Sequence, residues 1–463
     1  MKAERRWLIL IGLFVLSLPA VTTRLYSSDE IQYFSYLRSL WFDRDVSFEN
    51  EYRYFYDRGV AANDGFRETF LERQTETGRR ISFATIGCAI LWAPFYAAGD
   101  AAARITGAPV DGYSKPYVAA VAYGSAVYGF LGLTIAILAA RRMQLDAFGA
   151  ALAVWLGTPL LFYMYVAPVF SHACSAFAVA SFIYVWLRVR GSWTPRGAAA
   201  LAASGALMAM VREQDAFLIL GPAVDFALRI LRTRDDSRMD AHRARSIAQV
   251  VATAAAVFAL VYLPQALAYR ALNGHIGPHS SVGRKMNWMS PHALQVLFSP
   301  EHGFFVWTPL ALIALAGIVT LLADRRSDRP IRQRPLAVSL LVMALLQVYV
   351  SGSVESWTVA GGFGQRRFIA LTAVLVIGYA AAGAALRARS RQGGRVLAAV
   401  TILAVYWNLA LSAEFATGLM DRQKLEPRKN AYDALVTLPA QAPSIVYRYL
   451  FDRESFYRSR GTP

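Results

Sequence analysis

Long apolar runs constrain the fold of this chain more than any other feature. Most are about 16 to 24 residues long and are rich in Ala, Leu, Val, Gly and aromatic residues. A helix rises about 1.5 Å per residue, so runs of this length match the ~30 Å hydrocarbon core of a bilayer. The alternation of polar and apolar residues that marks a membrane strand is absent from these runs. We therefore predict helices that cross a membrane.

The composition supports this prediction. Of the 463 residues, 56% are hydrophobic and 17% are charged, which is too apolar for a set of water-soluble domains. We predict an all-α fold, a polytopic transmembrane helical bundle of about 11 spans. The predicted spans are residues 7–23, 117–140, 148–166, 169–187, 197–211, 214–231, 247–267, 305–323, 336–350, 368–386 and 396–413.

The basic residues gather on one predicted side of the membrane. The formal net charge is +17, with 48 Lys and Arg against 31 Asp and Glu. With a cytoplasmic N-terminus, the inner segments hold 23 of the Lys and Arg residues and the short outer loops hold 8. This bias follows the positive-inside rule, and it explains the net charge without a nucleic-acid partner.

The apolar segment 81–103 is the ambiguous one. A crossing there would reverse every later loop and place the basic stretch 232–246 outside. We therefore expect 81–103 to lie in or dip into the outer interface, a location that suits Trp92, Pro94 and Asp100. The alternative is an ordinary crossing combined with an error elsewhere in the span count.

The first apolar segment has two interpretations. Lys2, Arg5 and Arg6 followed by an apolar core are typical of a signal peptide, but Leu18 and Ala20 make a poor small-x-small cleavage site. We expect an uncleaved anchor.

The predicted outer loop 24–80 opens with an acidic pair, Asp29 and Glu30, at the end of the first span. Asp29 and Tyr33 are spaced i, i+4, so they share one face of a helix. A carboxylate held at the membrane edge can orient an alcohol and accept its proton, although a solvated acidic pair is the ordinary alternative. The same helix has an apolar stripe that would lie along the membrane surface, formed by Tyr33, Tyr36, Leu37 and Leu40.

Two later stretches have the character of outer loops that lead into spans. They are "HSSVGRKMNWMSPHALQVLFSPEHGFFVWTPL" at 279–310 and "ESWTVAGGFGQRRFIALTAVL" at 355–375. Together with the short inner N-terminus, the single span and the long loop opening with Asp-Glu, they make the chain resemble the GT-C superfamily of lipid-linked sugar transferases. Its protein O-mannosyltransferase branch and the bacterial aminoarabinose transferase of lipid A are similar. The resemblance covers most of residues 1–415, mainly as topology.

The resemblance implies roles for residues of the first loop. Asp29 corresponds to the family's catalytic aspartate, Glu30 is its acidic neighbour, and Tyr33 is a contact on the donor side. The basic segment before the interfacial piece implies Arg79 and Arg80 as ligands of the lipid phosphate. The proline that the family commonly has in that segment is absent here.

A lipid-phosphate leaving group also needs cations, and Arg suits this role because its planar fork binds two oxygens. Arg366 and Arg367 rank first because they follow "GGFG", whose small residues allow a substrate close to the backbone. The alternative for Arg367 is an interface anchor, and for Arg212 a solvated tip paired with Glu213 or Asp215. The full set of further substrate-binding candidates is His172, Arg212, Arg284, Lys285, Glu355, Trp357, Arg366 and Arg367.

The remaining chemistry-bearing residues give weaker signals. His172 is a substrate-binding candidate, although a lone histidine at the start of a span more often has a structural hydrogen bond. Cys88 and Cys174 lie in apolar stretches and are expected to be free. The sequence shows no HExxH motif and no set of ligands at zinc spacing, so no cofactor is certain, and a divalent metal is possible but not indicated.

We therefore expect an inverting glycosyltransferase that moves a sugar from a polyprenyl-phosphate donor to a lipid, glycan or protein acceptor. Its expected location is the bacterial inner membrane, with the active site facing the periplasm. The alternatives are a transporter or flippase of lipid-linked sugars and an O-antigen ligase or polymerase. Residues 1–413 would form the transmembrane domain, with 24–116 as the first outer loop carrying juxtamembrane helices, and 414–463 would form an outer tail.

Overall fold

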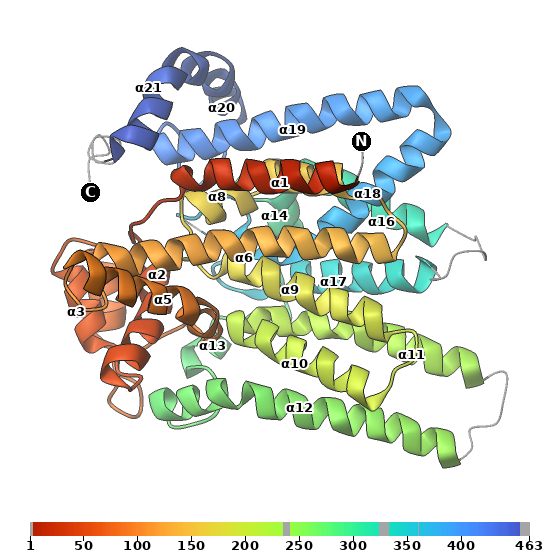
Figure 1. Ribbon diagram of the computed structural model, residues 1–463, viewed down its shortest axis with the longest axis horizontal. Coiled ribbons are helices and arrows are strands. Elements are labelled where there is room, and N and C mark those ends of the chain that lie inside the picture. Colours follow the sequence, from red (N-terminus) through yellow and green to blue (C-terminus); the bar gives the residue numbers. More distant parts are fainter. Residues whose placement is uncertain (1–2, 235–240, 324–332, 360, 454–463) are drawn as a thin grey trace. The chain divides into compact units, whose positions relative to one another are not determined.

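The computed structural model describes residues 3–234, 241–323, 333–359 and 361–453, and the all-α prediction is confirmed for them (Figure 1). An isolated bridge between Gln74 and Arg80 accompanies the helices. Among these residues, six helices are long and apolar enough to cross a membrane. They are α6 (Lys115–Arg142), α9 (His172–Val189), α12 (Ala241–Asn273), α17 (Gln333–Ser353), α18 (Thr372–Arg389) and α19 (Arg391–Thr417).

Shorter helices account for the other predicted spans. α1 (Ala3–Ser17), α7 (Phe148–Gly157), α10 (Pro195–Val211), α11 (Leu220–Arg234) and α16 (Leu310–Leu322) each coincide with part of one. α5 (Gly87–Thr106) covers most of the ambiguous segment and is not among the six long apolar helices. The total of 11 spans and the interfacial location of α5 stay predictions.

Two predicted spans differ in detail from the helices observed. The span predicted at 148–166 is interrupted at Thr158 and Pro159, after which α8 (Leu160–Tyr165) begins. Pro159 has no N–H for the helix ladder, and the Thr158 hydroxyl instead donates to the carbonyl of Val154 at 2.7 Å. The span predicted at 214–231 starts with a 3₁₀ segment, η4 (Glu213–Ile219), before α11.

The chain forms two compact units, each built from separated segments. Unit 1 contains 1–21, 136–166 and 287–463, and unit 2 contains 22–135 and 167–286. The predicted tail from 414 onward belongs to unit 1, and its last residues, 454–463, lie outside the described part of the chain.

Unit 1 is held together by close helix packing. Gly317 of α16 and Gly378 of α18 allow the two backbones to touch, since a Cβ placed at Gly317 would lie 1.8 Å from the carbonyl oxygen of Gly378. Beyond α19 the chain folds back through α20 (Pro427–Tyr432), η6 (Asp433–Thr437) and α21 (Leu438–Phe451) onto α19. Ala410, Ala434 and Leu438 form the small apolar cluster at that contact.

Unit 2 combines α9, α10 and α12 with the helices of the first loop. α10 packs against both α9 and α12, as Figure 1 shows. Near the far end of α9, Arg190 forms an ion pair with Asp225 of α11 at 2.7 Å, and the Trp186 indole donates to the same carboxylate at 3.0 Å. These contacts therefore join the C-terminal end of α9 to α11.

The first loop is a folded part of unit 2. α2 (Ser28–Arg38) continues into a short π-helix, η2 (Ser39–Asp43), and packs against α3 (Glu49–Tyr56) and α5. Phe34 of α2 makes edge-to-face contacts with Phe55 of α3 and Tyr96 of α5. The predicted helix is confirmed, but its single apolar stripe is not, because Ile31 and Phe34 are fully buried while Leu40 is 38% exposed. Coverage by α3 and α5 buries faces that a helix lying alone on a membrane would expose.

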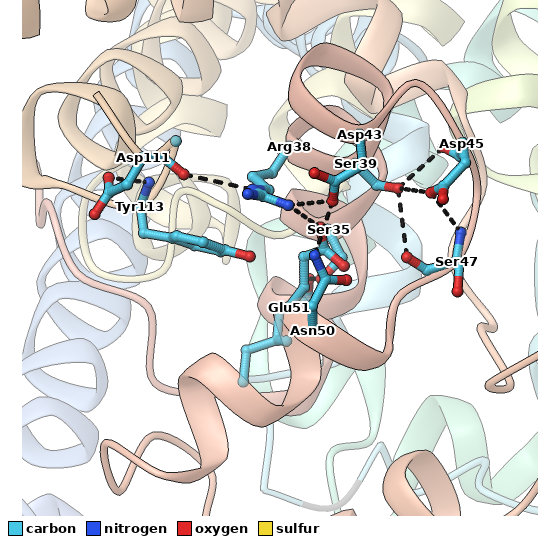
Figure 2. A network of polar contacts seen from close by, with 12 residues as sticks. Ser35, Arg38, Ser39, Asp43, Asp45, Ser47, Asn50, Glu51, Asp111 and Tyr113 are labelled. Carbon is cyan, nitrogen blue, oxygen red and sulfur yellow. Dashed lines mark hydrogen bonds and ion pairs between the residues drawn. The ribbon is translucent and has the colours of Figure 1, made fainter. Parts of the chain in front are cut away.

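Arg38 fixes the end of α2 (Figure 2). Its guanidinium forms ion pairs with Asp43 and with the buried Glu51, and the Glu51 contact is 3.0 Å. It also lies 4.7 Å from the centre of the Tyr113 ring and donates to the backbone carbonyl of Asp111. Because these partners come from η2, α3 and the turn after α5, the network ties the first loop into one body.

Candidate functional site

The predicted catalytic pair lies in the first turn of α2. Ser27 is the N-cap, and its hydroxyl accepts from the backbone N–H of Glu30 at 3.3 Å. The carboxylate of Glu30 accepts in return from the N–H groups of Tyr26 at 2.9 Å and Ser27 at 3.2 Å. This capping box fixes where the helix begins and therefore holds Asp29, which lies between the two capping residues, in a defined place.

Asp29 and Glu30 have different environments. Glu30 is completely buried, and burial raises its pKa to about 8, opposed by the hydrogen bonds from Tyr26 and Ser27. Asp29 is only partly buried. Glu30 therefore stabilises the start of the helix, whereas Asp29 is accessible to a substrate.

Tyr33 connects α2 to the helix ends of unit 2. Its hydroxyl lies close to Ser171, the residue just before α9, and it lies within electrostatic range of Arg212 and Asp29. Burial raises the pKa of Tyr33 above its usual range, and the positive charge of Arg212 acts in the opposite direction. One turn of α2 therefore brings Asp29 and Tyr33 to the tip that follows α10.

Arg212 stands at that tip, where α10 ends and η4 begins. Its guanidinium contacts the Nδ1 atom of His172, the first residue of α9. Asp215 is also within its electrostatic range, and the Asp215 carboxylate accepts from the Ser175 hydroxyl at 2.6 Å. The predicted candidates Asp29, Tyr33, His172 and Arg212 thus belong to one cluster, here called the Asp29 cluster.

The segment before α5 sets the position of this tip. The Thr85 hydroxyl donates to the carbonyl of Val211 at 2.9 Å, and the N–H of Ile86 donates to Gln265 of α12 at 2.8 Å. A Cβ at Gly87 would lie only 2.3 Å from the backbone carbonyl carbon of Met210. The backbones of α5 and α10 therefore meet directly beside Arg212.

A second carboxylate occupies the same tip and was not among the residues chosen from the sequence. Glu213 accepts from the hydroxyl of Tyr269, near the end of α12. The hydroxyl of Tyr36 on α2 lies within electrostatic range of Glu213. Burial raises the pKa of Glu213, and the bond from Tyr269 lowers it. Its position directly after Arg212 is the only sequence feature that points to it, and that position alone suggests no more than a partner of the arginine.

Other basic candidates of unit 2 have separate surroundings. Arg80 is engaged by Glu49 at 3.1 Å and is mostly buried, and one nitrogen of Arg79 is buried without a hydrogen-bond partner in the described residues. Arg284 and Lys285 are exposed, and the Lys285 ammonium lies 5.3 Å from the centre of the Phe83 ring. Arg80 and Lys285 therefore contact partners outside the Asp29 cluster.

The candidates from the stretch 355–375 belong to unit 1. Arg367 donates to the backbone carbonyl of Ser356 at 3.0 Å, and Gly362 lies directly against the side chain of Arg366. The Trp357 ring stacks on His292 at 5.3 Å, while Glu355 is exposed. The glycine-rich turn therefore folds back on the basic pair that follows it.

His302, which the sequence analysis did not choose, is buried beside the same turn. Its ring stacks on Trp307 with the centroids 4.7 Å apart. Burial lowers its pKa to about 4, and the positive charge of Arg366 acts in the same direction. A neutral His302 therefore packs the end of the stretch 279–310 against the turn that precedes Arg366.

No group of three or more His, Cys, Asp or Glu side chains in the described residues has the arrangement of a metal site. Cys88 and Cys174 are buried and free, as expected.

The long apolar helices define a polytopic helical membrane protein, and the Asp29 cluster lies at the helix ends of its unit 2. Neither a family model nor a curated protein sequence matches the chain. Among solved structures, it is similar to ArnT from Cupriavidus metallidurans in the apo state, with a TM-score of 0.50 and 16% sequence identity. The match covers 99% of this chain and 74% of that chain. The resemblance predicted from the sequence is thereby confirmed for the fold, which is similar to that of ArnT.

Proposed function

We propose that this protein is an inverting glycosyltransferase that uses a polyprenyl-phosphate sugar as donor. The observation that carries the proposal is the meeting of Asp29, Tyr33 and Arg212 at the helix ends of unit 2, within an ArnT-like fold. ArnT is an aminoarabinose transferase of the GT-C superfamily. A carboxylate and an arginine near the same tyrosine supply the two functions that displacement of a lipid phosphate requires.

The reaction assigns one role to each residue of the Asp29 cluster. The acceptor hydroxyl loses its proton to Asp29 while its oxygen forms a bond to the anomeric carbon of the sugar. The bond from that carbon to the phosphate oxygen breaks, and the electron pair leaves with polyprenyl phosphate. Arg212 stabilises the charge of the departing phosphate, and His172 holds the guanidinium through Nδ1. Attack opposite the leaving group inverts the anomeric centre.

Supporting roles follow from the same geometry. Glu30 is a positioning residue, because its buried carboxylate caps the turn that holds Asp29. Arg366 and Arg367 are further candidates for the donor phosphate, next to the glycine-rich turn. The acceptor is a lipid, glycan or protein on the periplasmic side of a bacterial inner membrane, and the N-terminus is cytoplasmic, as the distribution of basic residues favours.

The substitution Asp29→Asn tests this function. It retains the shape of the side chain and removes the basic carboxylate, so we expect transfer to be abolished while thermal stability stays close to wild type. The exposed Asp57 provides a matched control, and Asp57→Asn should transfer normally. The assay uses purified protein in detergent with a polyprenyl-phosphate sugar and a cell-envelope extract, and it measures released polyprenyl phosphate.

Two results would contradict the proposal. Normal turnover by Asp29→Asn would remove this residue from the mechanism. Movement of the lipid-linked sugar across proteoliposome bilayers, without release of polyprenyl phosphate from any acceptor mixture, would identify a transporter.

A further inference from the structure

Glu213 and the phenol groups around it form a second cluster beside the proposed catalytic residues. The carboxylate accepts from Tyr269 of α12, and within the described residues this is its one hydrogen bond to a side chain. The hydroxyl of Tyr36 on α2 is completely buried and lies close to Ser82. Tyr262, also on α12, lies within electrostatic range of Glu213. Glu213 itself is only partly buried.

The two clusters are in register along α2. Asp29, Tyr33 and Tyr36 follow the spacing i, i+4, i+7 and therefore lie on one face of the helix. Tyr33 lies within electrostatic range of Arg212, and Tyr36 lies within electrostatic range of Glu213. Arg212 is thus near Tyr33 and Glu213 is near Tyr36, and these two tyrosines lie about one helical turn apart along α2 (~5 Å).

A cation followed by an anion along α2 suits neighbouring parts of one donor molecule. In a polyprenyl-phosphate sugar the phosphate is joined directly to the sugar ring, so an anion and a set of hydrogen-bond donors lie next to each other. A carboxylate is an acceptor only, and its bonds to hydroxyl or ammonium donors are the strong charge-assisted kind. It would repel the phosphate, so its ligand is the sugar.

We propose that Glu213, oriented by Tyr269 and flanked by Tyr36, forms the subsite that binds a hydroxyl or ammonium group of the donor sugar. This inference rests on the proposed function for the identity of the donor. Arg212 binds the phosphate, and Glu213 selects a sugar that presents a donor group on the neighbouring edge. Tyr269 is a positioning residue, since its hydroxyl donates to one oxygen of the Glu213 carboxylate and thereby orients the carboxylate.

Direct binding separates this subsite from turnover. The full-length protein in detergent is titrated with three probes, namely polyprenyl phosphate, polyprenyl-phosphate mannose and polyprenyl-phosphate aminoarabinose. The wild type should bind at least one sugar-bearing probe more tightly than polyprenyl phosphate. Glu213→Gln should weaken binding of that probe at least tenfold and leave polyprenyl phosphate unaffected. Tyr269→Phe should weaken it about threefold to tenfold, because the carboxylate persists without its orienting bond.

The probes also distinguish the two chemical sources. Recognition of an ammonium group predicts that Glu213→Gln affects the aminoarabinose probe alone, whereas recognition of a hydroxyl predicts losses for both sugars. Glu68, which is exposed on the first loop, provides the control Glu68→Gln, which should bind all probes as the wild type does. Thermal unfolding shows whether Glu213→Gln is folded. If it is not, the binding of the three probes by Tyr269→Phe tests the subsite.

Equal weakening of all three probes by Glu213→Gln, or no weakening, would overturn the subsite. Equal binding of all probes by the wild type would do the same. A wild type that prefers the sugar-bearing probe through Glu213 but releases no polyprenyl phosphate would instead refute the transferase and leave the sugar site intact.

Discussion

Gly87 is the point at which a single methyl group should disturb the Asp29 cluster without touching any of its side chains. A Cβ added there would lie 2.3 Å from the carbonyl carbon of Met210 and 2.4 Å from the backbone nitrogen of Val211. Carbon atoms in contact prefer about 3.5 Å, so the shortfall at Met210 is about 1.2 Å. Both obstacles are backbone atoms and cannot rotate away. In Gly87→Ala the start of α5 and the end of α10 must therefore separate by roughly this distance.

Separation of α5 and α10 in Gly87→Ala should affect both the stability and the activity of the protein. Overpacking of this kind costs about 1 to 3 kcal/mol of unfolding free energy. Arg212 directly follows Val211, so it moves with the end of α10, and a displacement of about 1 Å at a reacting group lowers kcat/KM roughly a hundredfold. We therefore expect a moderate loss of stability and a much larger loss of transfer.

The assay compares Gly87→Ala with Gly149→Ala. Gly149 lies on α7, is exposed, and has no atom within 4 Å of an added Cβ, so its substitution should leave both properties unchanged or slightly stabilise the helix. Denaturation in detergent gives the stability, and release of polyprenyl phosphate gives kcat/KM. Wild-type values of both in Gly87→Ala would refute the contact between α5 and α10. Loss of stability with full activity would refute the dependence of the site on this contact.

Three further outcomes are expected. Replacement of Arg366 and Arg367 by Gln should lower kcat/KM roughly tenfold to a hundredfold if they bind the donor phosphate, with Lys recovering only part, and an unchanged kcat/KM would exclude them. Burial raises the pKa of Glu51 to about 7 from 4.5, so the folded state binds this proton more tightly than the unfolded chain. Stability should therefore fall as pH rises from about 4.5 to 7 and level off above, and Glu51→Gln should reduce that fall; a wild type equally stable at both ends would contradict it. A reporter active only in the periplasm should be active when fused after Glu426 and silent after Ser390, and the reverse pattern would overturn the predicted orientation.

Some of the fold was decided by short-range features that a sequence displays directly. The length and apolarity of the runs predicted the helices, and α6, α9 and α12 lie where the runs are. The capping residues Ser27 and Glu30 fix the start of α2, so the place of Asp29 was also readable from local sequence. Pro159 gave a local reason for a break, yet the strength of the apolar run obscured it.

The composition of the site depended on contacts between distant parts of the chain. Arg366 ranked above Arg212 in the sequence because glycines precede it, but the structure joins Arg212 to Tyr33 and His172. Periodicity gives the face of a helix and not the partner that the face meets. For the same reason Glu213 had no functional signal until Tyr269 of α12 was found against it.

The sequence by itself determined that this chain crosses a membrane as helices and that an acidic turn follows the first of them, because hydropathy and capping act over a few residues. The tertiary structure decided that α2 is buried on several sides and not along one stripe, since α3 and α5 cover it. It also decided which charges surround Asp29, because the ends of α9, α10 and α12 converge only when the helices pack.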